Sequence, residues 1–522
     1  MDIQLFLLIF ANFIGILGTN SYIHPDEQFQ SIEPLLRYLL NDDFNSNNGS
    51  LTWEYVFNKS VNKKPIRSLA VLALYYGPII NFCLFIYNKF SSISALNIIH
   101  IVKAFNFIVF TLVFIKFNNV FNRSCSINKS ASIFFVFTSY TLLTYQVRFF
   151  SNSIETVLLM LSIKFMKQKR YFLFAITTAI GFHNRITFIG WLAFPGLVLL
   201  YKECWVNKNY KKIVFKIMAP FLLASGTICK IDSKLYSTNE LIYTPLENIF
   251  YNKNLTNLSK HGIHSKLTHV CVNIPALLGP FLIIFWKCKK KINYSNIPLM
   301  AVISGLVFHS LIPHQEARFL IPMVPLIIVS CDFKKLQINR KIIKLVVFAN
   351  LLFNTVMVVL MGSLHQSGLI SFLKTKENLS IIQDTDIGYW HTLMPSHWPY
   401  YISLNETVRD DLFINFVSSE YDTVSGYREF DTSLREVDFS KQKHNIIDFM
   451  GIDTDNLVHL LNTIKTATGN NQMHLVLPYS FLHLLSQDTN SFEVIAYDPY
   501  HLNLNDGLST WPFGLCIAKI EY

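Results

Sequence analysis

Two carboxylates follow an apolar N-terminal run in the sequence His24-Pro25-Asp26-Glu27. Ionisable groups at membrane depth are costly and usually face a cavity or a partner, which favours a reactive role for Asp26 and Glu27. The alternative is that the acids only stabilise the start of an interfacial helix, because Pro25 suits a first turn and acids suit a helix N-terminus. The tetrapeptide alone leaves both interpretations open.

More polar motifs interrupt the apolar pattern further along the chain: RFFSNSIE at 148–155, HNR at 183–185, a long polar segment at 230–269 and HQEARF at 314–319. Their candidate substrate-binding residues are Arg148, Asn152, Glu155, Arg185, His314, Glu316 and Arg318. Arginines and histidines together with a carboxylate pair match an anionic, phosphate-bearing ligand that meets a general base. The alternative is that the arginines lie at a membrane interface and pair with nearby carboxylates.

The elements that position these motifs are apolar helices. Of 522 residues, 51% are hydrophobic and only 15% are charged, and the mean hydropathy is +0.32, which excludes a single soluble domain. Apolar stretches lie at 3–19, 69–87, 96–117, 131–147, 154–166, 171–182, 186–201, 213–229, 270–286, 297–313, 319–331 and 342–364. We therefore predict an all-α polytopic membrane protein with about 11 spans.

The net charge of +11 does not indicate a nucleic-acid partner, because the basic residues lie in loops that set the orientation of the protein in the membrane. Lysine and arginine gather in short loops between spans, at 123–129, 167–170, 202–212, 287–291 and 334–341. Basic loops remain in the cytoplasm, and alternation of the spans then places every polar motif after residue 147 on the opposite side. That side also holds everything after about residue 365.

The stretch 69–87 decides where the first loop faces. The loop shares the lumenal side only if 1–19 crosses the membrane and 69–87 does not. Gly77 and Pro78 interrupt 69–87, which suits an interfacial or re-entrant helix pair. If 69–87 spans instead and the N-terminus is inverted, Asp26 faces the cytosol. Composition leaves this choice open.

The chain changes character after residue 365, with more acidic residues and shorter apolar runs. QMHLVLP, YSFLHLL, FEVIAY and FGLCIAKIEY predict strand, helix, strand and strand, and so a small α/β domain. The predicted organisation is a multispan domain at 1–364, whose first lumenal loop at 20–95 carries Asp26, followed by a lumenal C-terminal domain at 365–522.

The cysteines and the glycosylation tripeptides add little to the assignment of fold and function. The eight cysteines are scattered and form neither a disulfide framework nor a CxxC metal site. Asn-x-Ser/Thr tripeptides at Asn122 and Asn128 fall in a loop assigned to the cytoplasm, whereas Asn254, Asn378 and Asn405 could carry glycan if the topology is right. A neighbouring tripeptide at Asn257 belongs to the second group.

SYIHPDEQFQSIEPL, YQVRFFSNSIETVLL, FHNRITFIGWLAFP and HQEARFLIPMVPL resemble, in order and spacing, motifs of the endoplasmic-reticulum mannosyltransferases that use dolichol phosphate mannose. These enzymes share a multispan fold called GT-C. The resemblance covers most of the chain, although the C-terminal segment only weakly. It implies a multi-pass enzyme of the endoplasmic reticulum whose active site is lumenal and whose partners are lipid-linked sugars.

Two further segments are similar to the branch of this family that acts on glycosylphosphatidylinositol (GPI) precursors: 244–269 and MGSLHQSG at 361–368. This similarity implies addition of a fourth mannose, in α1,2 linkage, to the third mannose of the precursor. The alternatives are the third-mannose enzyme and a mannosyltransferase of N-glycan precursors. A polytopic transporter is an alternative of another class, but no symmetric pair of Gly/Pro-broken helices is evident in two halves.

The resemblance also implies a mechanism. The donor is β-linked and the product α-linked, so one inverting displacement with a single carboxylate base is expected. Asp26 is the expected base, Glu27 supports the acceptor sugar, His24 orients, and the arginines hold the phosphate. No cofactor or metal is expected, because no nucleotide diphosphate is bound. Relatives carry Trp-Lys-Thr-Tyr-x-Pro-Pro where this chain has 390–396, WHTLMPS, which puts a role of that Lys or Tyr in doubt.

Overall fold

The computed structural model describes residues 3–40, 52, 54–57, 63–90, 94–254, 262–290, 296–338, 340–374, 386–403, 412–416, 419–421, 428–430, 444–469, 472–488, 492–504 and 512–521. The chain divides into two compact units that interleave along the sequence. Unit 1 comprises Met1–Gly18, Trp53–Asn81 and Ile101–Val358, and unit 2 comprises Thr19–Thr52, Phe82–His100 and Val359–Tyr522. The predicted division into 1–364 and 365–522 stays a prediction.

Unit 1 is helical, as its long apolar stretches predict. Its helices are α1 (Ile3–Leu17), α3 (Leu69–Tyr75), α6 (Ser126–Phe137), α7 (Ser151–Lys167), α8 (Tyr171–Asn184), α9 (Phe188–Leu200), α10 (Tyr210–Ile213), α11 (Ala219–Leu235), α12 (Thr244–Lys253), α14 (Ile274–Leu278), α15 (Phe281–Cys288), α16 (Ile297–Leu311), α17 (Met323–Val329) and α18 (Arg340–Met357). Two more helices, α4 (Gly77–Phe90) and α5 (Ala95–Phe121), cross the division between the units.

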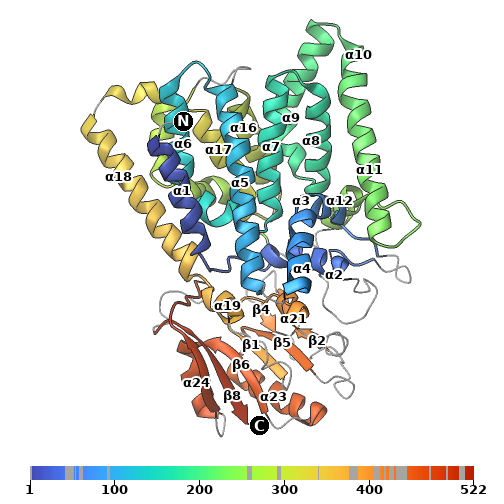
Figure 1. The fold of residues 1–522 in the computed structure, drawn as a ribbon, viewed down its shortest axis with the longest axis vertical. Helices are drawn as coiled ribbons and strands as arrows, with labels where there is room; N and C mark the ends of the chain where they lie inside the picture. The colour runs from blue at the N-terminus through green and yellow to red at the C-terminus, as the bar shows by residue number, and fades with distance from the viewer. Residues whose placement is uncertain are drawn as a thin grey trace. The chain divides into compact units, whose positions relative to one another are not determined.

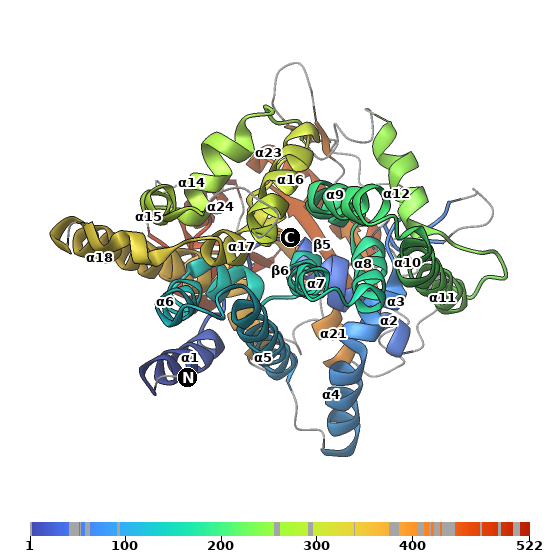
Figure 2. The same ribbon diagram turned by 90° about the horizontal axis from the view of Figure 1, so that it is seen from above.

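Helix α7 occupies the centre of one group of helices. It packs against α8, which packs in turn against α11, while α9 packs against α16 (Figures 1 and 2). Its residues from Ser151 to Met160 are all buried, on every face of the helix. A helix buried all round belongs in the interior. By contrast, α11 and α18 expose large side chains such as Leu223 and Leu345, as suits contact with lipid.

Among the described residues, four helices are long and apolar enough to cross a membrane, or six if each of two bent pairs counts as one span. The pair α3 and α4 bends by 63°, next to the predicted interruption at Gly77 and Pro78. The stretch 270–286 was predicted as one apolar stretch, and the structure bends it by 103° between Leu278 and Phe281. Gly279 has a φ of +49° there, and Pro280 lacks the N–H that would continue the helix. The total of about 11 spans stays a prediction.

A polar cluster closes the end of unit 1 that carries the basic loops. The amide of Asn122 donates to Asn118 Oδ1 at 2.8 Å, and its own Oδ1 accepts from Lys290 Nζ at 2.9 Å. Asn128 Nδ2 donates to Asp332 Oδ1 at 3.1 Å. Both asparagines of the two glycosylation tripeptides are therefore buried, with 3% and 5% of their surface exposed.

Unit 2 contains a six-stranded sheet in the order β2-β5-β1-β6-β8-β7. The strands are β1 (Asp386–Trp390), β2 (Leu412–Phe416), β5 (His444–Met450), β6 (Gln472–Pro478), β7 (Phe492–Asp498) and β8 (Leu515–Glu521), and a separate pair is formed by β3 (Ser419–Tyr421) and β4 (Arg428–Phe430). β2, β5, β1 and β6 run parallel, and β8 pairs antiparallel with both β6 and β7.

Helices α23 (Thr454–Thr468) and α24 (Leu482–Asp488) supply part of the sheet's core. Leu457, Leu460 and Ile464 of α23 are buried in one cluster with Phe449 and Leu475 of the strands. The strand, helix, strand and strand predicted for the last 50 or so residues are β6, α24, β7 and β8. α23 connects the parallel strands β5 and β6, which need a crossover.

In the described part of unit 2 there are also the short helices α2 (Glu33–Leu39), α19 (Ser367–Ser371) and α21 (Trp398–Ser403). The segment 361–368 forms main-chain hydrogen bonds with the start of the first loop. Ser21 N donates to Gly362 O at 3.1 Å, and Tyr22 N donates to His365 O at 3.0 Å. The MGSLHQSG motif is therefore hydrogen-bonded to the start of the segment that carries Asp26.

Candidate active site

The acidic loop, residues 23–28, lies in unit 2 and turns at Pro25. The N–H groups of Gln28 and Phe29 donate to Pro25 O at 2.9 and 3.0 Å, so a helical turn begins directly after the proline. This turn leads into a π-helical segment, Gln28–Ile32, and then α2. π-helical turns are uncommon and recur at functional sites.

Asp26 is oriented by its neighbours. Gln30 Nε2 donates to Asp26 Oδ2 at 2.7 Å, and the Asp26 N–H donates to His24 Nδ1 at 3.1 Å. His24 Nδ1 also lies 3.7 Å from Asp26 Oδ1. Sequence reasoning missed Gln30, although its spacing of four residues from Asp26 is the signal that places two side chains on one helix face.

The two acids of the motif differ in accessibility. The side chain of Asp26 is 24% exposed, whereas Glu27 is only 1% exposed, with Oε2 facing the Ile23 N–H at 3.5 Å. A general base must come within hydrogen-bond reach of the proton it removes. In this structure Asp26 is accessible to solvent, whereas Glu27 is enclosed.

In unit 1, Glu155 contacts two other predicted residues, Arg185 and Asn152. α8 ends at Asn184, and Arg185 leaves the helix with an extended backbone. Its Nη1 donates to Ser151 Oγ at 2.9 Å, and its Nε lies 3.5 Å from Glu155 Oε2. Asn152 Nδ2 donates to the same carboxylate oxygen at 3.3 Å. The RFFSNSIE and HNR motifs therefore meet at the start of α7.

Glu316 contacts two further predicted residues, His314 and Arg318. Arg318 donates to both of its oxygens, from Nη2 to Oε1 at 2.9 Å and from Nε to Oε2. His314 Nε2 lies 2.6 Å from Oε1. This fork-to-carboxylate geometry is the strong, directional form of an arginine contact. Gln315 fixes the loop, because its Oε1 accepts from His269 N at 2.9 Å.

Phe319 joins the two groups. Its ring centroid lies 5.1 Å from the guanidinium carbon of Arg185 and 5.5 Å from that of Arg318. Arg318 also lies 5.8 Å from the ring of Phe150. Contacts in this range are attractive. We call Glu155, Arg185, Glu316, Arg318 and Phe319 the arginine cluster. Phe319 was not predicted, and its place beside Arg318 in HQEARF was the available signal.

Arg148 and His183 are buried elsewhere in unit 1. Arg148 Nε donates to Thr144 O at 3.0 Å, and its own carbonyl accepts from Asn106 Nδ2 at 2.9 Å. The ring of His183 packs edge-on against Tyr243 with 5.5 Å between centroids. The HNR motif therefore contributes Arg185 to the cluster, while its histidine contacts the segment before α12.

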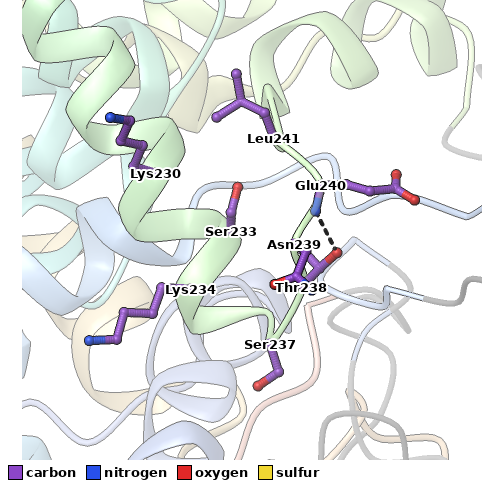
Figure 3. A pocket seen from close by; sticks show the side chains of 8 residues that line it. All are labelled: Lys230, Ser233, Lys234, Ser237, Thr238, Asn239, Glu240 and Leu241. Atoms are coloured by element: carbon purple, nitrogen blue, oxygen red, sulfur yellow. Dashed lines mark hydrogen bonds between the residues drawn. The ribbon is translucent and has the colours of Figure 1, made fainter.

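No group of three or more His, Cys, Asp or Glu side chains is arranged to hold a metal in the described part of the chain. A pocket does open beside the end of α11, but none of the predicted site residues lines it (Figure 3). The side chains of Lys230 and Lys234 point away from the facing segment 237–241, in which Glu240 N donates to Thr238 Oγ1 at 3.1 Å (Figure 3). These lysines do not converge on one point as an anion site requires.

Comparison with known proteins identifies relatives over nearly the whole chain. Residues 3–394 match the profile of the Alg9-like mannosyltransferase family. The chain is 31% identical to GPI mannosyltransferase 4 of Candida albicans, over 96% of this chain and 94% of that protein. It is 30% identical to GPI mannosyltransferase 4 of Saccharomyces cerevisiae, over 98% of each.

Among solved structures, the crystal structure of ArnT from Cupriavidus metallidurans bound to undecaprenyl phosphate is similar, with a TM-score of 0.52 and 11% sequence identity. The match covers 99% of this chain and 97% of that one. At this identity the likeness shows the fold alone, which is the multispan GT-C fold.

Proposed function

This chain belongs to the Alg9-like mannosyltransferase family, and we propose that it transfers mannose from dolichol phosphate mannose, in α1,2 linkage, to the third mannose of a GPI-anchor precursor. The observation that carries the proposal is the near full-length similarity to several fungal proteins named GPI mannosyltransferase 4. The predicted resemblance to that fungal enzyme is thereby confirmed, and the chain is a membrane glycosyltransferase.

The reaction is a single inverting displacement. The acceptor oxygen attacks the anomeric carbon of mannose and forms the new C–O bond, while the bond from that carbon to the phosphate oxygen breaks. The acceptor proton passes to the carboxylate of Asp26, and dolichyl phosphate leaves with the bonding electrons. The exposure of Asp26 and the enclosure of Glu27 support this assignment of the base. Glu27 and His24 then hold the loop and the acceptor sugar in place.

The arginine cluster is proposed to bind the phosphate of the donor. Each guanidinium has five N–H donors in a fixed plane, so it can keep its carboxylate partner and still bind an anion. Pairing with Glu155 and Glu316 keeps Arg185 and Arg318 in place before the donor arrives. Asn152 and His314 contact the two carboxylates and support this arrangement. The competing explanation is a purely structural set of buried ion pairs.

The proposed location is the membrane of the endoplasmic reticulum, with Asp26 facing the lumen. The one-sided distribution of the basic loops supports it. A C-terminal tag should be protected from protease in sealed microsomes, and cleavage without detergent would contradict this topology. The C-terminal residue itself and Asn257, Asn378 and Asn405 lie outside the described residues.

The decisive experiment is depletion of the protein followed by analysis of the GPI intermediates. A precursor with three mannoses and no bridging ethanolamine on the last of them should accumulate. A two-mannose species would identify the third-mannose enzyme, and shortened N-glycan precursors would identify the asparagine-linked branch. Transfer of radiolabelled mannose in microsomes separates any of these enzymes from a transporter.

A further inference from the structure

A buried carboxylate ties the helix after the acidic loop to the C-terminal part of unit 2. Glu33 begins α2 and has no exposed surface. Its Oε2 accepts hydrogen bonds from the main-chain N–H groups of His397 and Trp398, at 3.2 and 3.0 Å. These two N–H groups stand at the start of α21, where helical N–H groups lack partners within the helix. A carboxylate from a distant segment supplies the partner.

The same two segments meet at further points. Trp398 Nε1 donates to Gln28 Oε1 at 2.9 Å, and the ring of His397 packs edge-on against Phe29 with 5.0 Å between centroids. On the other side of the acidic loop, Tyr22 OH donates to Met394 O at 3.0 Å. The segment 394–398 therefore contacts the chain both before and after Asp26.

These contacts with the segment 394–398 restrict the position of Asp26, although none of them involves the side chain of Asp26. Asp26 and Glu33 lie about two turns apart on one continuous helical segment, so a shift of one moves the other. Burying a carboxylate costs several kcal/mol unless its partners compensate, and an apolar side chain would fill the space without that cost. Burial does raise the pKa of Glu33 to about 7, with the two N–H donors and Arg37 opposing the rise.

We propose that Glu33 is a positioning residue for the reaction, which holds Asp26 in place by binding the main chain of the segment 394–398. The proposal rests on the function proposed above. The contacts use the carbonyl of Met394 and the N–H groups of His397 and Trp398, so they depend on the main chain of that segment.

The test compares two substitutions of Glu33 in purified full-length protein, with dolichol phosphate mannose as donor. Glu33→Gln keeps an oxygen that can accept both N–H groups and should keep transfer within about twofold of wild type. Glu33→Leu removes the acceptor. It should lower kcat about tenfold and leave the KM of the acceptor unchanged, because misplacing a reacting group affects the chemical step. The matched control is Glu493→Gln on the exposed face of β7.

A double-mutant comparison separates positioning from general weakening of the fold. In an Asp26→Asn background, Glu33→Leu should cause no further loss, since the group it positions is already disabled. A further tenfold loss in that background, or normal kcat for Glu33→Leu, would overturn the proposal. If the wild-type protein transfers no mannose at all, it is the proposed function that fails.

A milder substitution provides a second test in case the Glu33→Leu protein does not fold. Trp398→Phe keeps a ring in the buried position, removes the hydrogen bond to Gln28 and reduces the side-chain volume. It should lower kcat about threefold. This loss should also vanish in the Asp26→Asn background, and persistence of the loss there would contradict the positioning role.

Discussion

The arginine cluster of unit 1 and the acidic loop of unit 2 hold their charged groups in different ways. In the cluster, each guanidinium faces a carboxylate, and an aromatic ring lies against both guanidinium groups. In the loop, the neighbours of Asp26 are anchored largely through main-chain groups, and Asp26 itself stays partly exposed. In the proposed function, the cluster binds a charge, whereas the loop supplies a group that changes its protonation state.

This difference predicts two kinetic signatures. Changes in the cluster should raise the KM of the lipid-linked donor, because they weaken binding of its phosphate. Changes in the loop should lower kcat, because they disturb proton removal in the transition state. The comparison fails if both regions give the same signature.

The largest effect is expected for Asp26→Asn. The amide keeps the size of the side chain but cannot accept the proton, so kcat should fall by about 10² or more. Radiolabelled mannose transfer measures the loss, and protein level should hold because losing an acid at a helix start typically costs only about 0.3–1 kcal/mol. Glu27→Gln is the matched comparison and should lose less. The reverse order of effects would exchange the two roles, and full activity of both variants would make the motif structural.

Arg318→Lys should have the next largest effect. Lysine keeps the charge but cannot donate to both oxygens of Glu316, so the donor-binding geometry is lost. One charge-assisted hydrogen bond contributes about 1.5–3 kcal/mol, so the donor KM should rise about tenfold or more. Titration of the donor at saturating acceptor measures it. A rise in the acceptor KM instead would assign the cluster to the other substrate.

Phe319→Leu should have a smaller effect of the same kind. Losing the ring between the two guanidinium groups removes two contacts of roughly 0.5–1 kcal/mol each, so the donor KM should rise about fivefold, at the lower end of this range. Phe319→Tyr keeps the ring and serves as the control. An equal loss in both variants would show that packing volume, and not the ring face, matters at this position.

The smallest effect concerns the pH dependence of stability. The pKa of Glu33 is raised to about 7 in the folded protein, against about 4.3 in an unfolded chain. Between about pH 4.3 and pH 7, the folded state keeps a proton on Glu33 that the unfolded chain has released. The free energy of unfolding therefore decreases as the pH rises towards and through 7. Glu33→Gln does not titrate, so between pH 6 and pH 8 it should gain about 1 kcal/mol relative to wild type. Thermal unfolding at the two pH values would show it, and parallel curves would exclude a raised pKa.

The positions of the helices were predictable because apolar stretches of the sequence report burial or lipid contact directly. Helices α5, α8, α9 and α16 lie where the apolar runs placed them. The 103° bend after α14 was not predicted. Gly279 and Pro280 permit a bend, but its angle depends on packing against distant residues such as Phe353, which closely approaches Gly279.

The residue types of the candidate site were predictable, and their partners were not. Charged residues in an apolar context stand out, which is why Glu155, Arg185 and Arg318 were found. Phe319 does not stand out in a chain with 45 phenylalanines. Glu33 was overlooked because an acid at the start of a helix has an ordinary local explanation, and its contact with residues 397–398 is visible only in three dimensions.

The buried asparagines at the end of unit 1 make folding and glycosylation mutually exclusive there. Asn122 and Asn128 each sit in an Asn-x-Ser tripeptide, yet their amides are enclosed by Asn118 and Asp332. A sugar attached to either amide would displace these contacts and hold the helices apart. In the proposed topology both tripeptides face the cytoplasm, and only a chain inserted in the opposite orientation would present them to the glycosylation machinery before it folds. A glycan on Asn122 or Asn128 would therefore identify a molecule that was inserted in the wrong orientation and did not fold.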